Sequence, residues 1–362
     1  MAKTVQQLLS ERRLPSLLRM SDGTEATKDS WSVRRAELLT ILQENIYGVT
    51  PAPCPVEGKI LKTDERYCAG KVRHHTVALT LHTPYGDHTF PVQLFLPVCN
   101  PNASAFIHIC FRPDFPDRYT PIEEITDHGF ALAMFDYRDI ATDDGDFTYG
   151  LGALYVGDRA RRENEWGKIG MWAYAASRVL DWLETVPGVD ASRVTVTGHS
   201  RLGKTAIWCA AQDERFFCGI SNDSGCGGAA IERGKVGEHV REITRVFPFW
   251  FCPKYASYAS DVYAMPFDHH FVSACVAPRL CYIASAAEDL WADPASEFLA
   301  AVAASDAYKL LGETGLSPVP EKLPIAPAAF GDGKLAYHVR RGLHYYDRED
   351  WLYQMAFIEK NL

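Results

Sequence analysis

The sequence contains no run of about 18 apolar residues, so it offers no candidate membrane-spanning helix. It has no C-x-x-C pair, which makes a zinc ribbon or a thioredoxin-like redox site improbable. Basic stripes and arginine-rich arms are also missing, and the net charge is −9. We therefore expect neither nucleic acid nor a membrane among the partners. There are no internal repeats and no low-complexity tracts.

An export signal is another feature that we do not find. The first residues, MAKTVQQLLSERRLPSLLRM, lack an apolar core and a small-residue cleavage site, and they predict an amphipathic helix. Ten cysteines occur, several of them within apolar stretches such as IHIC, IWCAA and RLCYIA. A free thiol in such a stretch behaves as a small buried hydrophobe. Together these observations favour a reduced, cytoplasmic protein.

The hydrophobic pattern predicts an α/β fold. Short apolar strands are expected at AFIHICF, GFALAMFDY, RVTVTGHS, FFCGISN, RLCYIASA and LAYHVRRG, and helices at KIGMWAYAASRVLDWLETV, RLGKTAIWCAAQ, DPASEFLAAVAASDAYKLLG and DREDWLYQMAFIEKN. Strands that are apolar throughout and alternate with helices predict a mostly parallel sheet covered on both faces. An antiparallel pair around PYGD should lie at its edge. We expect one domain over residues 1–362, with a helical lead-in at about residues 1–50.

The stretch GHSRLGK, residues 198–204, is the first candidate for chemistry. It follows a predicted strand and opens a predicted helix, which is the context of a nucleophile elbow. Such a turn exposes a serine at a helix N-terminus, where backbone N–H groups can stabilise an oxyanion. The usual motif is G-x-S-x-G, but here Leu202 holds the last position and Gly203 follows it. On this motif alone, an ordinary N-cap serine is an equal alternative to a nucleophilic Ser200.

Candidate partners for Ser200 follow later strands, in the order serine, acid, histidine. RLCYIASA is followed by AEDLWADP, which offers three carboxylates: Glu288, Asp289 and Asp293. LAYHVRRG is followed by LHYYD, which offers His344 as the base. Asp223, in ISNDSGCGG, is a further candidate for the acid, although turn aspartates are common. The ends of parallel strands meet at one edge of the sheet, where such sites form.

Several motifs together resemble the bacterial branch of carbohydrate esterase family 15, the glucuronoyl esterases. They are GHSRLGK, NDSGCGGAA, GEHVREITRVFPFWF, ASAAEDLWADP and RRGLHYYDREDW, and they occur in the family's order over roughly residues 100–360. The resemblance implies a metal-free α/β-hydrolase. Its serine motif, G-x-S-R-x-G-K, has the glycine at the later position that this sequence uses.

The resemblance also implies roles for particular residues. Ser200 would attack the ester carbonyl, and His344 would act as general base and then as general acid. Arg201 would help to stabilise the oxyanion, although by sequence alone it is an ordinary surface charge in a first helical turn.

Three further positions match family residues that contact the sugar: Lys204, Glu238 and Trp291. Without the resemblance, Lys204 and Glu238 would be solvated surface charges, and Trp291 would be as consistent with the core as with a sugar platform.

Two departures from the family pattern matter. Many members have glutamate at the position of Asp223, one methylene longer, and some bacterial relatives take the acid after the following strand instead. We therefore favour Asp289 as the partner of His344 and keep Asp223 as a partner or substitute. Many relatives are secreted, whereas no export signal is found here. A cytoplasmic enzyme would act on a small-molecule or oligosaccharide uronate ester.

Other clusters are weaker candidates. Adjacent histidines occur in His74–His75 and in the segment 268–270 (DHH), but neighbouring residues of a strand point to opposite faces, so they are weak evidence for a metal site. We expect no metal and no cofactor. Cys226, in SGCGG, could be a thiol nucleophile, but it does not lie in the sequence context of a nucleophile elbow. DYRDIATDDGDFTYG, residues 136–150, is acid-rich without the spacing of a calcium loop, and we expect it to rim the site. Trp166 is expected to pack in the interior.

The leading hypothesis is a serine carboxylic ester hydrolase that cleaves esters of glucuronic or 4-O-methyl-glucuronic acid. An acetyl xylan or other acetyl-sugar esterase on the same scaffold is an alternative, because pocket contacts and not the triad set the preference for the acyl group. A catalytically silent carbohydrate-binding relative is a third possibility.

Overall fold

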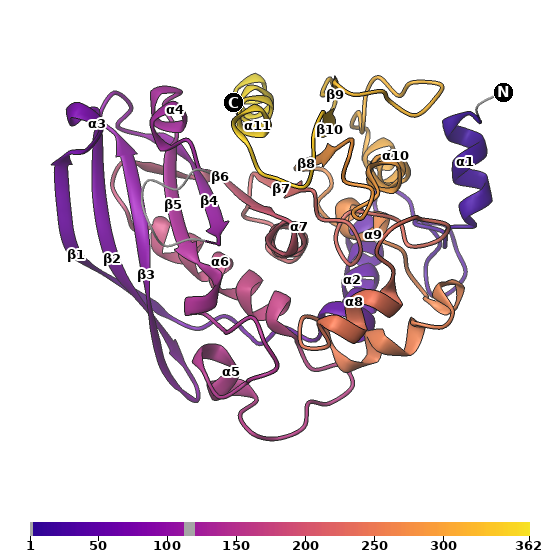
Figure 1. The fold of residues 1–362 in the computed structure, drawn as a ribbon, viewed down its shortest axis with the longest axis horizontal. Coiled ribbons are helices and arrows are strands. Elements are labelled where there is room, and N and C mark those ends of the chain that lie inside the picture. The colour runs from indigo at the N-terminus through magenta and orange to yellow at the C-terminus, as the bar shows by residue number, and fades with distance from the viewer. Residues whose placement is uncertain (1–2, 112–119) are drawn as a thin grey trace.

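The computed structural model describes residues 3–111 and 120–362. A ten-stranded sheet runs through the molecule in the order β1-β2-β3-β5-β4-β6-β7-β8-β10-β9 (Figure 1). Six strands in the middle are parallel to one another, and the strands at both edges are antiparallel to their neighbours. The strands are β1 (Val56–Arg66), β2 (Val72–Thr83), β3 (Gly86–Pro97), β4 (Ala103–Cys110), β5 (Ala131–Asp136), β6 (Val189–His199), β7 (Cys218–Asn222), β8 (Leu280–Ala286), β9 (Ala328–Phe330) and β10 (Leu335–Arg340).

Helices cover both faces of this sheet (Figure 1). The α-helices are α1 (Val5–Arg12), α2 (Trp31–Leu42), α3 (Tyr67–Gly70), α4 (Ile122–Asp127), α5 (Gly150–Tyr155), α6 (Lys168–Leu183), α7 (Arg201–Gln212), α8 (Val240–Val246), α9 (His270–Ala274), α10 (Pro294–Leu311) and α11 (Arg348–Lys360). A π-helical turn, Gln43–Tyr47, extends α2, and short 3₁₀ turns lie at Tyr137–Asp139, Pro253–Tyr258 and Val262–Ala264.

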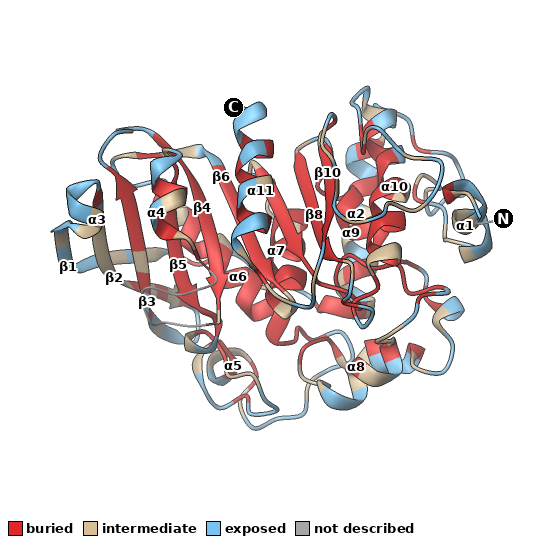
Figure 2. Ribbon diagram, turned by 45° about the horizontal axis from the view of Figure 1, so that its top comes forward, coloured by how far each residue is buried: buried red, intermediate tan, exposed pale blue. Residues whose placement is uncertain are grey.

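Side-chain alternation along the central strands divides the core into two layers. In β5, Ala133 and Phe135 belong to the larger hydrophobic cluster, whereas Leu132 and Met134 belong to the smaller one. The larger cluster packs α2, α6, α7 and α10 against one face of the sheet, and the smaller cluster packs α4 and α11 against the other. Because both faces are covered, β4, β5 and β8 are buried along their whole length (Figure 2). The predicted three-layer α/β arrangement is confirmed.

Two strands, β1 and β9, were not predicted by the sequence analysis. β1 is an edge strand, and most of its side chains are exposed on both faces. Its sequence, VEGKILKTDER, is charged and lacks the apolar alternation of a half-buried strand. β9 is only three residues long, and it pairs with β10 by its backbone.

The N-terminal helix is shorter than predicted. The amphipathic pattern was expected to continue through Met20, but α1 ends at Arg12 and Arg13 is left-handed, with φ 50°. Pro15 explains the stop, because a proline lacks the N–H that a continuing helix needs and disfavours helical geometry in the residue before it. The second helical element of the lead-in is α2, which packs Leu38 and Leu42 into the larger cluster.

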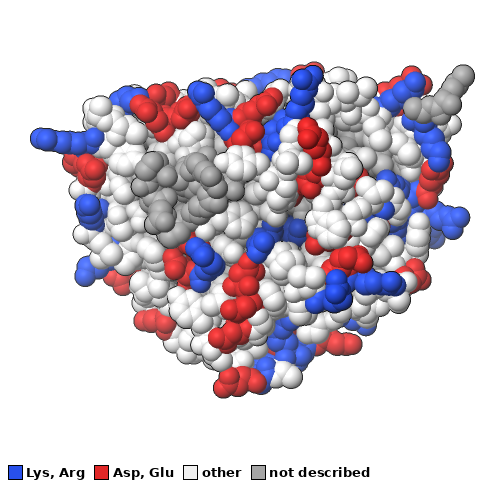
Figure 3. Space-filling view, viewed as in Figure 1, with Lys and Arg blue, Asp and Glu red and all other residues white. Residues whose placement is uncertain are grey.

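No helix within the described ranges combines the length and the apolar content that crossing a bilayer requires. On the face seen in Figure 3, acidic and basic side chains are interspersed.

We expect Gly198→Ala to destabilise the protein strongly. A Cβ atom on Gly198 would lie 2.3 Å from the carbonyl oxygen of Leu202, and neither backbone can move without shifting β6 or α7. The free energy of unfolding, measured by urea denaturation, should fall by roughly 2–4 kcal/mol. The matched control is Gly145→Ala, whose Cβ would meet open space and which should change stability by no more than about 0.5 kcal/mol. Equal stability of the two variants would contradict the packing argument.

Candidate active site

The candidate site forms where four neighbouring strands of the parallel sheet end. Ser200 follows β6, Asp223 follows β7, Asp289 lies in the loop after β8, and His344 lies in the loop after β10. These residues are up to 144 positions apart in the chain, and the strand order β6-β7-β8-β10 brings their loops together at one edge.

Ser200 occupies a strained turn between β6 and α7. Its backbone has φ 58° and ψ −125°, a region that L-residues rarely adopt. The turn is held by a hydrogen bond from the Ser200 N–H to the carbonyl oxygen of Asn222, at 2.8 Å. Gly203 packs against the same carbonyl, and a Cβ there would lie 2.8 Å from it. The point where α7 comes closest to β7 is therefore position 203, and the glycine is needed there. Position 202 does not need a glycine, so it can hold leucine.

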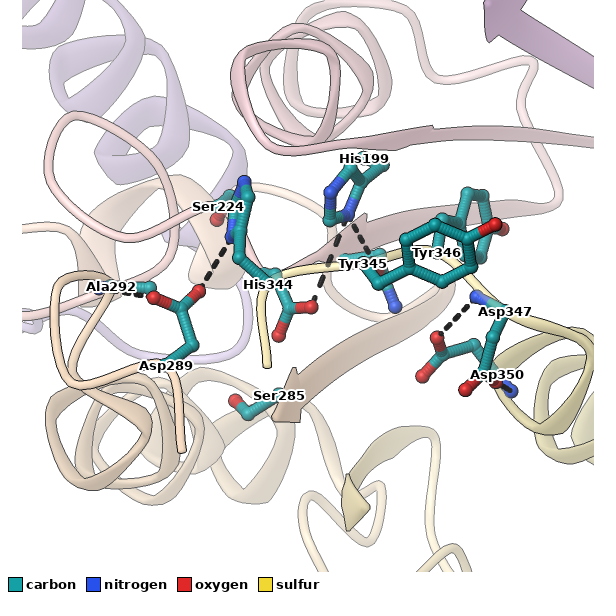
Figure 4. A network of polar contacts seen from close by, with 12 residues as sticks. His199, Ser224, Ser285, Asp289, Ala292, His344, Tyr345, Tyr346, Asp347 and Asp350 are labelled. Atoms are coloured by element: carbon teal, nitrogen blue, oxygen red, sulfur yellow. Dashed lines mark hydrogen bonds and ion pairs between the residues drawn. The ribbon is translucent and has the colours of Figure 1, made fainter. Parts of the chain in front are cut away.

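His344 is placed beside this turn and is hydrogen-bonded to Asp289 (Figure 4). The distance from its Nδ1 to Asp289 Oδ2 is 2.6 Å. On the other side, its ring lies 4.4 Å from the ring of His199, the residue that precedes the serine. Burial raises the pKa of Asp289, but the hydrogen bond and charge of His344 outweigh it and leave that pKa below its usual value. Asp289 is thus a carboxylate suited to orient the imidazole and offset its charge.

Asp223 has a different partner. Its Oδ2 lies 3.3 Å from Nη2 of Arg340 and 4.0 Å from Nδ1 of His199. Asp223 is also close to His344, because one donor atom from each of His199, Asp223 and His344 lies within 4.8 Å of the others. Burial raises the pKa of Asp223 well above its usual value. Asp289 therefore makes the direct contact with His344, whereas Asp223 contacts Arg340 and His199.

Arg340 is a functional residue that the sequence analysis missed. Its buried guanidinium donates hydrogen bonds to the carbonyl oxygens of Arg341, Leu343 and Tyr345, the residues that flank His344 in its loop. The same guanidinium pairs with Asp350 at 2.9 Å and with Asp223. It thus fixes the backbone that presents the histidine. The only signal for it in the sequence is an arginine at the end of an apolar strand.

Arg201 is not an ordinary surface charge. Its guanidinium carbon lies 4.7 Å from the ring centre of Trp250, and the rings of Phe111 and Phe247 are each 5.7 Å away. Nη1 pairs with the carboxylate of Asp143, which belongs to the acid-rich segment 136–150. That segment therefore reaches the site, as predicted.

The three sugar-contact candidates have distinct environments. Lys204 is buried, which lowers the pKa of its ammonium group, and it donates a hydrogen bond to the carbonyl oxygen of Ser224. The charge of Glu238 opposes this lowering. The backbone N–H of Glu238 donates to the carbonyl oxygen of Trp291 at 2.9 Å, which joins the two loops. The Trp291 side chain is 57% exposed, so it is a surface group and not part of the core.

The weaker candidates serve the structure. Asp268 is fully buried and accepts hydrogen bonds from backbone N–H groups, including that of Glu232 at 2.8 Å. Burial raises the pKa of the Cys226 thiol well above its usual value, which leaves it protonated and a poor nucleophile. Trp166 is buried, as predicted.

The sheet topology and the strained serine turn define an α/β-hydrolase. A family profile described as glucuronyl esterase, fungi, matches residues 114–312. A carbohydrate esterase named MZ0003, from an unknown prokaryotic organism, is 39% identical over 250 residues, which are 67% of this chain and 56% of that protein. The chain thus spans little more than half of that relative's length.

A glucuronoyl esterase from Solibacter usitatus has the same fold, with a TM-score of 0.88 and 33% identity over 96% of this chain and 97% of that one. A 4-O-methyl-glucuronoyl methylesterase from Hypocrea jecorina is 29% identical over 84% of this chain and 64% of its own length. The chain belongs to the glucuronoyl esterases, carbohydrate esterase family 15. The resemblance inferred from the motifs is confirmed.

We expect Asp289 and Asp223 to differ in their effect on ester hydrolysis. Asp289→Asn removes the charge bonded to His344 and should lower kcat/KM by about 10³-fold, with the fold retained. Asp223→Asn is the matched control, and it should lower kcat/KM by less than about 10-fold, because Arg340 keeps Asp350 and three carbonyl partners. Steady-state kinetics with melting curves would check this. The reverse ranking would show that Asp223 is the working acid.

Glu297 lies against the turn at Ser224 and Gly225, whose Ser224 carbonyl oxygen accepts a hydrogen bond from Lys204. Its fully buried carboxylate accepts hydrogen bonds from the Ser285 hydroxyl at 2.6 Å and from the Gly225 N–H at 2.9 Å. Ser224, whose carbonyl oxygen binds Lys204, is the residue before Gly225. Burial raises the pKa of Glu297 to about 7. The folded protein therefore holds a proton here that the unfolded chain releases at lower pH.

Glu297→Gln should change how stability depends on pH. Between the usual carboxyl pKa and about 7 the native Glu297 binds more protons than the unfolded one, so its contribution to stability falls as the pH rises. Glutamine does not titrate. The unfolding free energy of the variant, relative to wild type, should therefore rise by about 2–3 kcal/mol from pH 4.5 to pH 8. Urea denaturation at both values measures this, and a constant difference would contradict the raised pKa.

Proposed function

We propose that this protein is a serine carboxylic ester hydrolase that cleaves esters of glucuronic acid or 4-O-methyl-glucuronic acid. One observation carries the proposal: a serine sits on a strained strand-to-helix turn, and the residue before it, His199, packs its ring 4.4 Å from the ring of His344, which is hydrogen-bonded to the buried carboxylate of Asp289. A merely structural serine would not need a strained backbone, and a silent binding protein would not need the 2.6 Å contact between His344 and Asp289.

The first half-reaction forms an acyl-enzyme. His344 takes the proton of the Ser200 hydroxyl as its oxygen attacks the ester carbonyl, and Asp289 stabilises the imidazolium that results. The negative charge that develops on the carbonyl oxygen meets Arg201 and backbone N–H groups at the start of α7. His344 then returns the proton to the leaving alcohol.

The second half-reaction releases the uronic acid. A water molecule loses its proton to His344 and attacks the acyl carbon, and Ser200 leaves with that proton. The acid product ionises at neutral pH, so it leaves with a charge that the ester did not have. Both half-reactions use the same base, His344, and the same oxyanion site, so they need no further catalytic residue.

The uronate sugar is the acyl part of the substrate, and we assign its recognition to three residues. Lys204 and Glu238 supply a donor and an acceptor for sugar hydroxyl groups, and the exposed Trp291 offers a face on which a ring can stack. The Hypocrea jecorina relative, a 4-O-methyl-glucuronoyl methylesterase, supports this choice of substrate class.

We place this activity in the cytoplasm, on small-molecule or oligosaccharide uronate esters. All ten cysteines are free and eight are buried, which suits a reducing compartment. Fractionation of the native host tests the location: the protein should appear with cytosolic markers, and its recovery from the culture medium would overturn this part of the proposal.

The substrate is tested with benzyl glucuronate and 4-nitrophenyl acetate, on wild type, Ser200→Ala and Lys204→Met. Methionine keeps the length of the buried lysine but removes its charge. We expect Lys204→Met to lower kcat/KM for the uronate ester by roughly 10- to 100-fold, because it loses a charged hydrogen bond, and to leave acetate hydrolysis within about 3-fold. Ser200→Ala should abolish both activities.

The controls separate the alternatives. Lys309→Met changes an exposed lysine, and both activities should stay as in wild type. Acetate cleavage alone, indifferent to Lys204, would indicate an acetyl-sugar esterase. Inactivity on both esters would favour a carbohydrate-binding protein, and turnover by Ser200→Ala would show that the nucleophile is another residue.

A further inference from the structure

Asp143 accepts hydrogen bonds from three side chains, two of which, Arg201 and Trp250, come from distant parts of the chain. Its Oδ1 accepts from the Trp250 indole N–H at 2.7 Å. Its Oδ2 accepts from the Tyr137 hydroxyl at 2.8 Å and from Nη1 of Arg201. The Asp143 side chain is 13% exposed, so these contacts are shielded from solvent. A carboxylate this well satisfied is held in one orientation.

The guanidinium of Arg201 is restrained on two sides by this arrangement. Its plane lies among the rings of Phe111, Phe247 and Trp250, and Asp143 holds Nη1. Its Nε–H is buried and has no hydrogen-bond partner among the described residues. A buried donor without a partner is costly, so the other contacts of the guanidinium must be strong enough to hold it in this orientation.

We propose that Asp143 is the positioning residue of Arg201: by holding Nη1, it fixes the orientation in which the guanidinium meets the oxygen of the scissile carbonyl. This inference rests on the proposed ester hydrolysis. The negative charge of Asp143 partly offsets the positive charge of Arg201, which by itself would weaken the attraction of Arg201 for an oxyanion. The benefit that we expect from Asp143 is therefore geometric. Asp143 therefore contributes through the orientation of Arg201, as preorganised donors do.

The loop that carries Asp143 is itself anchored from the other side. The buried ammonium of Lys168 donates hydrogen bonds to the carbonyl oxygen of Asp146 and to the Thr142 hydroxyl, the latter at 3.2 Å. It also lies 4.3 Å from the ring centre of Phe147. Lys168, the first residue of α6, thus holds the chain on both sides of Asp143, at Thr142 and at Asp146.

The substitution Asp143→Asn removes the hydrogen bond to Arg201 and keeps the other two. The side-chain oxygen of the asparagine can still accept from Trp250, and its NH₂ group can donate to the Tyr137 hydroxyl. The same NH₂ group would face the Nη1 donor of Arg201 and lose that bond alone. We expect Asp143→Asn to lower kcat for benzyl glucuronate by roughly 10- to 100-fold, with KM within about 2-fold and an unchanged melting temperature.

A double-mutant cycle with Arg201→Met tests whether Asp143 acts through the arginine. If it does, Asp143→Asn should add less than about 2-fold to the loss in kcat caused by Arg201→Met. The control is Asp144→Asn: the neighbouring side chain bonds Thr142 and the Asp146 N–H, which asparagine can also do, so kcat should stay at the wild-type value.

The outcomes are distinguishable. Full activity of Asp143→Asn, losses that multiply in the double variant, or a rise in KM without a fall in kcat would each overturn the positioning role while the esterase proposal stands. A wild-type protein inert on both esters would overturn the proposed function, and the positioning role with it.

Discussion

The strained backbone of Ser200 is the constraint on which the rest of the site depends. A turn with φ 58° persists only because the Asn222 carbonyl oxygen holds the Ser200 N–H, while Gly198 and Gly203 let α7 approach the sheet closely. The turn sets Ser200 at the end of β6 and begins α7 with the next residue. Every other functional group is placed relative to this fixed point.

Buried charge holds the surrounding loops. Arg340 binds the backbone around His344, Lys168 binds the loop of Asp143, and Lys204 binds the carbonyl of Ser224. Burying an ammonium or a guanidinium is costly unless its donors are satisfied, so each loop that satisfies one is held in place. The site is therefore organised by cations that lie under it, and the exposed His344 and Trp291 are left for the substrate.

The sequence analysis succeeded where local pattern and tertiary structure agree, and failed where they differ. The central strands and α6, α7, α10 and α11 were predicted because buried apolar periodicity is strong in each of them. β1 was missed because an edge strand exposed on both faces carries no such signal. The length of α1 was overestimated because the pattern continued past Arg13, where Pro15 stops the helix.

The sequence by itself determined the family and the order of the central elements, and it marked Ser200, His344 and two possible acids as candidates, because motifs and periodicity are local properties. Only the tertiary structure decided which carboxylate bonds His344, since that depends on where the loops after β7 and β8 end in space. It also decided that Arg201 and Lys204 are enclosed and not solvated. Burial and hydrogen-bond geometry arise from residues far apart in the chain, and no local pattern encodes them.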